Sequence, residues 1–158
     1  TPVTDQQTEN STGAVYVFSR SEDGWSQTAY LKASNTGRED WFGVRVALSG
    51  DGNMLVVGAQ LEDSAAQGVN SNEDDDTAQE AGAAYIFTRD DGVWSQVSYV
   101  KSSNSEAYDE FGGSIAISRD GGTIAVGARG EDSAVGGLNG NQDNNSASEA
   151  GAVYLFSY

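Results

Sequence analysis

The six residues Gly13-Ala-Val-Tyr-Val-Phe18 return as Gly82-Ala-Ala-Tyr-Ile-Phe87 and again as Gly151-Ala-Val-Tyr-Leu-Phe156. The copies begin 69 residues apart (82 minus 13, and 151 minus 82), and residues 13–81 align with residues 82–150 without a gap at about 33 identical positions. A fixed period of this length is typical of stacked or radially arranged supersecondary units. The apolar run itself predicts a strand that is buried on both faces, and the rest of each unit is placed relative to it.

Composition favours a single domain built from β-strands. The chain has 158 residues, of which 37% are hydrophobic, and it contains 20 glycines but no sustained helical periodicity. Its net charge is −16, with only 8 basic residues and no histidine, so nucleic acid and anionic membrane surfaces would repel it. It has no cysteine, hence no disulfide framework, and no apolar run approaches the roughly 20 residues of a membrane span. Cations are the natural counterparts of such a chain.

The phase of the repeat divides the chain into four segments. Residues 1–12 are expected to be the tail of a preceding loop, 13–81 and 82–150 the two repeat units, and 151–158 the first strand of a third unit. Asp5 aligns with Asp74 and Asp143 at the same interval. This phasing predicts an excerpt from a longer array, the alternative being a complete chain whose missing neighbours come from other subunits.

Each unit is expected to contribute four antiparallel strands, joined by tight turns and by one long loop. Asp-Gly pairs between apolar runs predict the hairpins. The predicted strands are 13–18, 25–32, 42–48, 54–59, 82–87, 94–101, 111–117, 123–128 and 151–157, with no helix longer than a single turn. The predicted core contains Phe42, Val46, Val57, Tyr85, Phe87, Ile115, Val126 and Tyr154. Four-stranded antiparallel sheets that repeat at a fixed period are the blades of a β-propeller, so the fold class is all-β, with about two blades in this chain.

Three ordered motifs carry a resemblance to a known family. They are Phe42-Gly43 with Phe111-Gly112, Val57-Gly-Ala59 with Val126-Gly-Ala128, and the Gly-Ala-x-Tyr-x-Phe strand. Together they resemble FG-GAP repeats, the units of the integrin α-subunit propeller and of many bacterial surface or secreted proteins. The resemblance implies strands that run outward from a central axis and a ring that usually closes with about seven blades. Only one blade here, roughly 41–101, has all four strands contiguous, so this chain alone cannot close a ring.

The tight turns depart from the calcium-binding pattern of that family. Many FG-GAP repeats carry Asp-x-Asp-x-Asp-Gly between their first two strands, whereas this chain has Ser49-Gly-Asp51-Gly and Ser118-Arg-Asp120-Gly. One acidic ligand of three is retained. These turns are therefore expected to be plain hairpins.

The two long loops are the candidate metal sites. Oxygen-bearing side chains fall on alternate residues at Asn70, Asn72, Asp74 and Asp76, and again at Asn139, Asn141, Asp143 and Asn145. Ca²⁺ takes six to eight oxygen ligands, which alternate residues of a curled loop can supply. The first loop also holds seven acidic groups and no basic one, a repulsion that a cation would relieve. The alternative is that these residues only cap turns and keep a surface loop soluble.

Glu62-Asp63 and Glu131-Asp132 open the same loops. They are expected either to cap the strand end by accepting backbone N–H bonds, or to contact a metal or ligand directly or through its shell. Adjacent carboxylates seldom have the opposed geometry of a glycosidase, and the common nucleophilic arrangements need His or Cys. Trp25 and Trp94 are expected to pack between blades rather than to stack on sugars.

The sequence therefore predicts a non-enzymatic, calcium-stabilised interaction or adhesion module at the cell surface or outside the cell. Its expected partners are a protein or glycan ligand, or copies of itself, with no nucleic acid and no membrane insertion. Two alternatives stay open. One is a structural subunit that assembles into a ring or filament by completing blades between chains at open sheet edges, and the other is part of a propeller-type polysaccharide-active enzyme.

Overall fold

A computed structural model describes residues 11–158, so the first ten residues of the predicted loop tail lie outside the described part. The described chain consists of nine strands and contains no helix. The strands are β1 (Val15–Ser21), β2 (Gly24–Leu31), β3 (Arg45–Leu48), β4 (Met54–Ala59), β5 (Ala83–Asp90), β6 (Val93–Val100), β7 (Phe111–Ile117), β8 (Thr123–Ala128) and β9 (Ala152–Ser157). Each overlaps one of the nine predicted strands, and the all-β prediction is confirmed.

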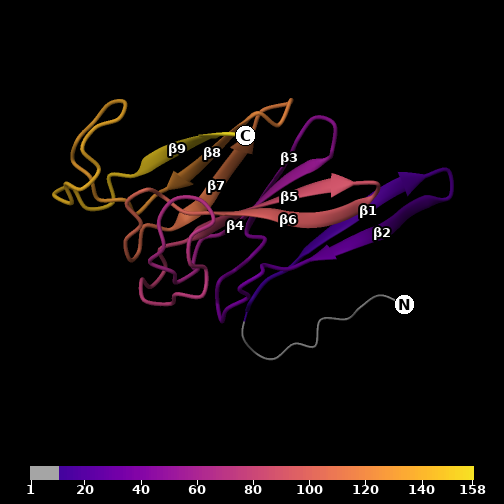
Figure 1. The fold of residues 1–158 in the computed structure, drawn as a ribbon, viewed down its shortest axis with the longest axis horizontal. Helices are drawn as coiled ribbons and strands as arrows, with labels where there is room; N and C mark the ends of the chain where they lie inside the picture. Colours follow the sequence, from indigo (N-terminus) through magenta and orange to yellow (C-terminus); the bar gives the residue numbers. More distant parts are fainter. Residues whose placement is uncertain (1–10) are drawn as a thin grey trace.

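The strands form three antiparallel sheets in chain order, β1-β2, β3-β4-β5-β6 and β7-β8-β9 (Figure 1). The middle sheet is a complete four-stranded blade. Its β4 and β5 are hydrogen-bonded neighbours, with Val57 opposite Tyr85, although a long loop separates them in the chain. The same pairing joins β8 to β9, with Val126 opposite Tyr154. The strand order predicted from the repeat is therefore confirmed for the described residues.

The tight turns are hairpins held by a short polar side chain. The Ser49 hydroxyl donates to Asp51 Oδ1 at 2.6 Å, and the Asn53 N–H donates to the same oxygen at 3.0 Å. These bonds hold the pKa of Asp51 below its ordinary value, with the Ser49 bond contributing most. Asp120 accepts from the Ser118 hydroxyl in the same way, at 2.6 Å. Each Asp is used to set the turn.

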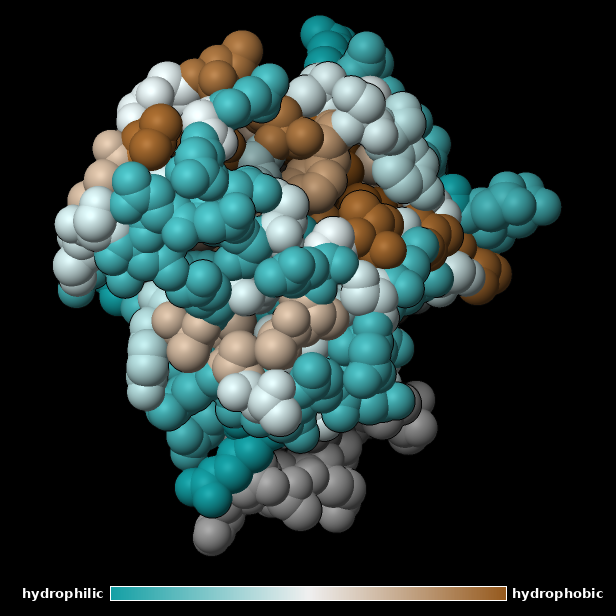
Figure 2. All heavy atoms as spheres, turned by 60° about the vertical axis from the view of Figure 1, so that its left-hand side comes forward, coloured by the Kyte–Doolittle hydropathy of each residue, from teal (hydrophilic) through white to brown (hydrophobic). Residues whose placement is uncertain are grey.

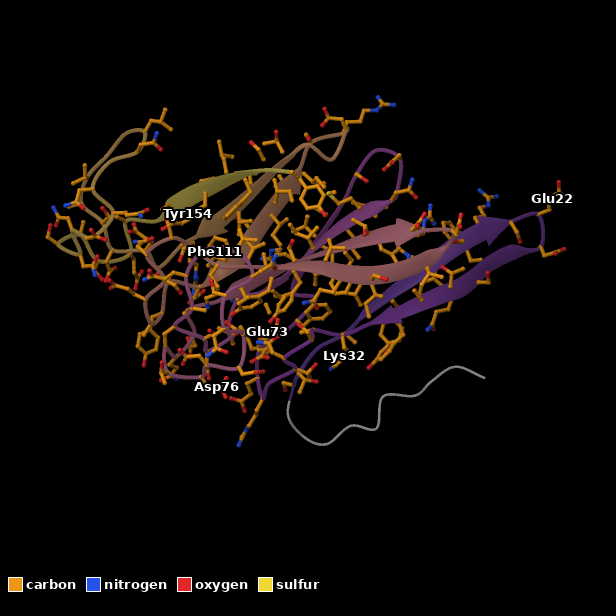
Figure 3. The ribbon with its side chains drawn as sticks, viewed as in Figure 1. Glu22, Lys32, Glu73, Asp76, Phe111 and Tyr154 are labelled. Carbon is orange, nitrogen blue, oxygen red and sulfur yellow. The ribbon has the colours of Figure 1, made fainter. Side chains whose placement is uncertain are left out.

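Two hydrophobic cores lie between successive sheets. The first joins the β1-β2 sheet to the middle sheet, and the second joins the middle sheet to the β7-β8-β9 sheet. Phe111 is fully buried in the second, and its ring lies 5.6 Å from that of Tyr154 (Figure 3). The predicted core residues Phe42, Val57, Tyr85, Phe87 and Val126 are buried, while Ile115 and Tyr154 are partly buried against the second core.

The prediction that Val46 belongs to the core is wrong, because its side chain is 54% exposed. Val46 lies opposite Val57 on β4, on the face that packs toward the β1-β2 sheet. That sheet supplies only two strands, which leave Val46 uncovered, and β3 packs instead against β7 of the third sheet. Ile115, one period later, packs against the complete middle sheet and is partly buried.

The expectation that Trp25 packs between blades is also wrong. Its side chain is 71% exposed, whereas Trp94, one period later, packs at the edge of the first core beneath the Arg89 guanidinium. The same residue type thus has two environments in two repeats. The difference follows from the neighbouring sheet that each tryptophan meets.

The Phe-Gly motif of one sheet contacts the start of the Gly-Ala-x-Tyr strand of the sheet before it. The Phe111 N–H donates to Ala81 O at 3.0 Å, and the backbone at Gly82 passes so close that a Cβ there would lie 2.1 Å from Phe111 O. Gly82 also has φ +80°, a conformation that L side chains rarely adopt. Both reasons require glycine, and they explain why these two motifs recur together.

Candidate functional site

A buried polar network at the start of the first long loop is the most organised cluster of charged groups in the described chain. Glu62 follows β4, and its carboxylate lies among hydrophobic strands, only 1% exposed. Its Oε1 accepts from Asn35 Nδ2 at 2.9 Å and from the Tyr99 hydroxyl at 2.8 Å. Its Oε2 accepts from Lys101 Nζ at 2.8 Å. Each carboxylate oxygen therefore has strong donors from outside the loop.

Two of the partners of Glu62, Tyr99 and Lys101, are as buried as the acid itself, and Asn35 is half-buried. Lys101 is fully buried, and burial lowers the pKa of its ammonium group. The Tyr85 hydroxyl donates to Asn35 Oδ1 at 2.6 Å, which leaves the Asn35 carboxamide bonded at both ends. Burial raises the pKa of Tyr85 and of Tyr99, so both phenols remain neutral donors. The network brings together the linker before β3, the start of the long loop, and β5 and β6.

The third sheet repeats the acid without the cation. Glu131 accepts from Asn104 Nδ2 at 3.0 Å and from the Ser133 N–H at 3.0 Å, and it is 2% exposed. The Tyr154 hydroxyl donates to Asn104 Oδ1 at 2.5 Å. No lysine or arginine forms an ion pair with Glu131 in residues 11–158, because β9 has no strand beside it in the place that β6 takes beside β5.

The acidic pairs that open the loops cap backbone groups, as one of the two predictions for them had it. Asp63 Oδ1 accepts from the Glu80 N–H at 2.8 Å, and the Gly82 N–H donates to Glu62 O at 2.8 Å. Asp132 Oδ1 accepts from the Glu149 N–H at 2.7 Å. These bonds tie the end of each long loop to its beginning, next to the sheet.

The four predicted metal ligands of the first loop are distributed over two places. Asn70 Oδ1 accepts from the Tyr99 N–H at 3.0 Å, which ties the loop to β6. Asn72 Oδ1 accepts from the Asp74 N–H at 3.3 Å, and Asn70, Asn72 and Asp74 line one hollow beside Tyr99. Asp76 lies instead near Asp40, whose pKa it helps to raise. Figure 3 shows Asp76 and Glu73 on the loop below the sheets.

The second loop repeats only part of this arrangement. Asn141 Oδ1 accepts from the Asp143 N–H at 3.1 Å, as in the first loop. Asn145 Nδ2 donates to Glu106 Oε2, a bond without a counterpart in the first loop because Gly37 stands one period before Glu106. In residues 11–158 no group of three or more Asp, Glu, His or Cys side chains is arranged to hold a metal ion. Any calcium site would therefore combine at most two carboxylates with amide and backbone oxygens.

Two buried aspartates were not predicted from the sequence. Asp40 accepts from the Gly37 N–H, and burial, with the nearby Glu62, Asp63 and Asp76, raises its pKa to about 6. Asp109 accepts from the Glu106 N–H at 2.8 Å, and burial raises its pKa to about 6 as well.

Lys101 and Asn35 were also not predicted as site residues. The signal that could have found both is Lys-x-Ser-Asn, which occurs at Lys32-Ala-Ser-Asn35 and again at Lys101-Ser-Ser-Asn104. Its two polar ends contact successive acids, since Lys101 reaches Glu62 and Asn104 reaches Glu131.

Antiparallel blades packed side by side, with a glycine junction between them, define a propeller-type repeat protein. The FG-GAP repeat family matches residues 25–87 and 94–156, and the chain belongs to that family. The two matched segments begin 69 residues apart (94 minus 25), the same period as the strand motif. The FG-GAP repeat is a non-catalytic, propeller-type unit. No curated protein matches the chain. Among the described residues no helix is long and apolar enough to cross a membrane.

Proposed function

We propose that this chain is a non-enzymatic interaction module of an extracellular or cell-surface protein, and that an extended strand from outside the described residues adds to the last sheet beside β9. The supporting observation is the contrast between the middle and last sheets. Strand β5 pairs with β6, whereas no described strand pairs with the outer edge of β9. On the face of β9 that points away from the second core, Val153 and Leu155 are 70% and 68% exposed. Figure 2 shows apolar side chains gathered in a band on an otherwise hydrophilic face.

A groove lies beside β9. Its volume is about 800 Å³, and the residues that line it include Tyr154, Leu155, Phe156 and the buried acid Glu131. In the middle sheet the equivalent position beside β5 is occupied by β6. Tyr99 of β6 lies opposite Tyr85, and Lys101, just after β6, bonds to Glu62. The strand we propose there is accordingly an extended segment with an aromatic residue followed, two positions later, by lysine. Backbone bonds would supply affinity, and Glu131 would select the cation.

A synthetic peptide with the sequence of residues 93–102 is the probe for this proposal. Calorimetry should show saturable binding to the protein, weakened at least about tenfold when the peptide lysine is replaced by methionine. Glu131→Gln in the protein should remove that preference for lysine. Asp51→Asn, in a turn of the middle sheet, is the matched control and should retain it. Absence of binding, or equal affinity for both peptides, would overturn the proposal.

Calcium stabilisation of the long loops is the second component of the proposal. Asn72 and Asn141 make the same turn bond in the two loops, and the hollow of the first loop is lined by Glu73 and Asp74 where the second loop has Gln142 and Asp143. The second site should be the weaker one, because it has one carboxylate fewer. Binding to the folded state alone would add about 2.7 kcal/mol to the free energy of unfolding at a hundredfold excess over Kd.

Melting curves with calcium and with EDTA test this component separately from strand addition. We expect Tm to fall in EDTA, with a smaller dependence on calcium in Asp74→Ala and in Asp143→Ala. Asp120→Ala, in a hairpin turn, is the control and should keep the full dependence. A Tm that EDTA leaves unmoved, together with no calcium uptake by calorimetry, would leave the loops as acidic turns.

A further inference from the structure

We propose that the middle blade forms a covalent cross-link between the side chains of Lys101 and Asn35, an amide bond made by the folded protein itself with release of ammonia. The geometry that carries this is one carboxylate with an amine on one oxygen and a carboxamide on the other. Lys101 Nζ lies 2.8 Å from Glu62 Oε2, and Asn35 Nδ2 lies 2.9 Å from Glu62 Oε1. Nothing in the function proposed above requires this bond.

The groups needed for amide transfer are connected through Glu62 and Asn35. Lys101 is the nucleophile, and its complete burial favours the neutral amine over the ammonium form. Glu62 contacts both the attacking and the departing nitrogen, so it can carry a proton from one to the other. The Tyr85 hydroxyl, 2.6 Å from Asn35 Oδ1, donates to the oxygen on which negative charge would develop.

The step balances without any other reagent. The Lys101 ammonium first passes a proton to Glu62, and the resulting amine attacks Asn35 Cγ to form the new C–N bond. Glu62 gives its proton to Nδ2 and takes one from Nζ, the bond between Cγ and Nδ2 breaks, and ammonia leaves. The products are a secondary amide and a protonated Glu62, which returns its proton to ammonia or solvent. No oxidant, metal or nucleotide is consumed.

The third sheet provides an internal comparison. Asn104, Glu131 and Tyr154 repeat the acceptor half of this arrangement, with Asn104 bonded to Glu131 at 3.0 Å and to Tyr154 at 2.5 Å. No lysine reaches Glu131 within the described residues, so this half has no nucleophile and should stay unmodified. The reaction is thus assigned to one set of residues, and the equivalent set one period later serves as its control.

The test is the mass of the purified wild-type chain. We expect the dominant species to be lighter than the sequence mass by about 17 Da, the mass of ammonia. Tryptic mapping should find a branched peptide that joins Asn35 to Lys101 and should find no cleavage after Lys101. A succinimide at Asn139-Gly140 would release the same mass, but it would leave Lys101 open to trypsin.

Variants identify the residues that take part, and the mass of the wild-type chain shows whether the cross-link forms. Lys101→Met, Asn35→Ala and Glu62→Gln should each restore the full mass, and Tyr85→Phe should slow the loss in a refolding time course. Asn104→Ala and Glu131→Gln are the matched controls and should still lose about 17 Da. A folded wild-type chain that keeps its full mass, with Lys101 cut by trypsin, would overturn the proposal, and this readout does not depend on whether any variant folds.

Discussion

Adding one methyl group at Gly82 tests how strictly the junction between two blades requires glycine. An alanine Cβ at Gly82 would lie 2.1 Å from Phe111 O and 2.5 Å from Phe111 N, both of which are backbone atoms that cannot swing aside. The residue also has φ +80°. Gly151 occupies the same position one period later, with φ +75°, but the nearest atom to its Cβ would be Arg129 O at 3.5 Å. The two glycines share their conformation and differ in crowding.

The free energies follow from that comparison. Alanine in a left-handed conformation costs about 1–2 kcal/mol, a penalty that both variants share. Forcing the two backbones apart at Gly82 should cost about 1–3 kcal/mol more, the range for overpacking a close contact. We therefore expect Gly151→Ala to lower the free energy of unfolding by about 1–2 kcal/mol and Gly82→Ala to lower it by about 2–5 kcal/mol.

Urea denaturation followed by tryptophan fluorescence measures both variants under one set of conditions. The difference between them isolates the approach of Phe111, because the backbone penalty cancels. If the two variants lose equal stability within about 0.5 kcal/mol, the junction yields to the methyl group and the reasoning from close contact is refuted.

Two further predictions concern pH and core packing. Burial raises the pKa of Asp40 and of Asp109 to about 6, against an ordinary 3.8, so the folded chain holds protons that the unfolded chain releases. Their contribution to the free energy of unfolding therefore falls as pH rises from about 4 to about 6 and is lost above that range, and Asp40→Asn should show a smaller fall than the wild type in urea titrations at several pH values. Phe111→Ala removes a fully buried ring and should cost about 3–5 kcal/mol, whereas Trp25→Ala, at a 71% exposed position, should change stability by less than about 0.5 kcal/mol in the same assay.

The repeat makes the fold predictable from the amino-acid sequence. Two or three copies of each strand give independent indications of its position, so the sequence alone predicts all nine strands and the pairing of β4 with β5. Burial is harder to predict, because it depends on which sheet lies opposite. Val46 and Ile115 are equivalent in sequence, but only Ile115 faces a complete sheet.

The Glu62 network could not be predicted from the sequence, for a different reason. Glu62 and Lys101 are 39 residues apart and lie on different elements, and acidic and basic residues of this kind are usually assigned to the surface. The alternating Asn and Asp of the long loops are conspicuous because they are close in sequence. Their side chains nevertheless bond to the turn and to β6, as Asn70 does through Tyr99.

The order of strands also bears on what can occupy the edge of β9. In the complete blade, β5 and β6 are the third and fourth strands of the sheet. The first sheet contains only these two strands, β1 and β2, and the last sheet ends at the third strand, β9. If a second copy of the chain were to complete the last sheet, its β1 and the resident β9 would compete for the third position. One of them would have to give up its hydrogen-bonded pairing with β2 or with β8. A single extended segment with the pattern of β6 meets no such competition, and it also brings the lysine that Glu131 lacks. The open edge therefore suits a single strand better than a second folded copy.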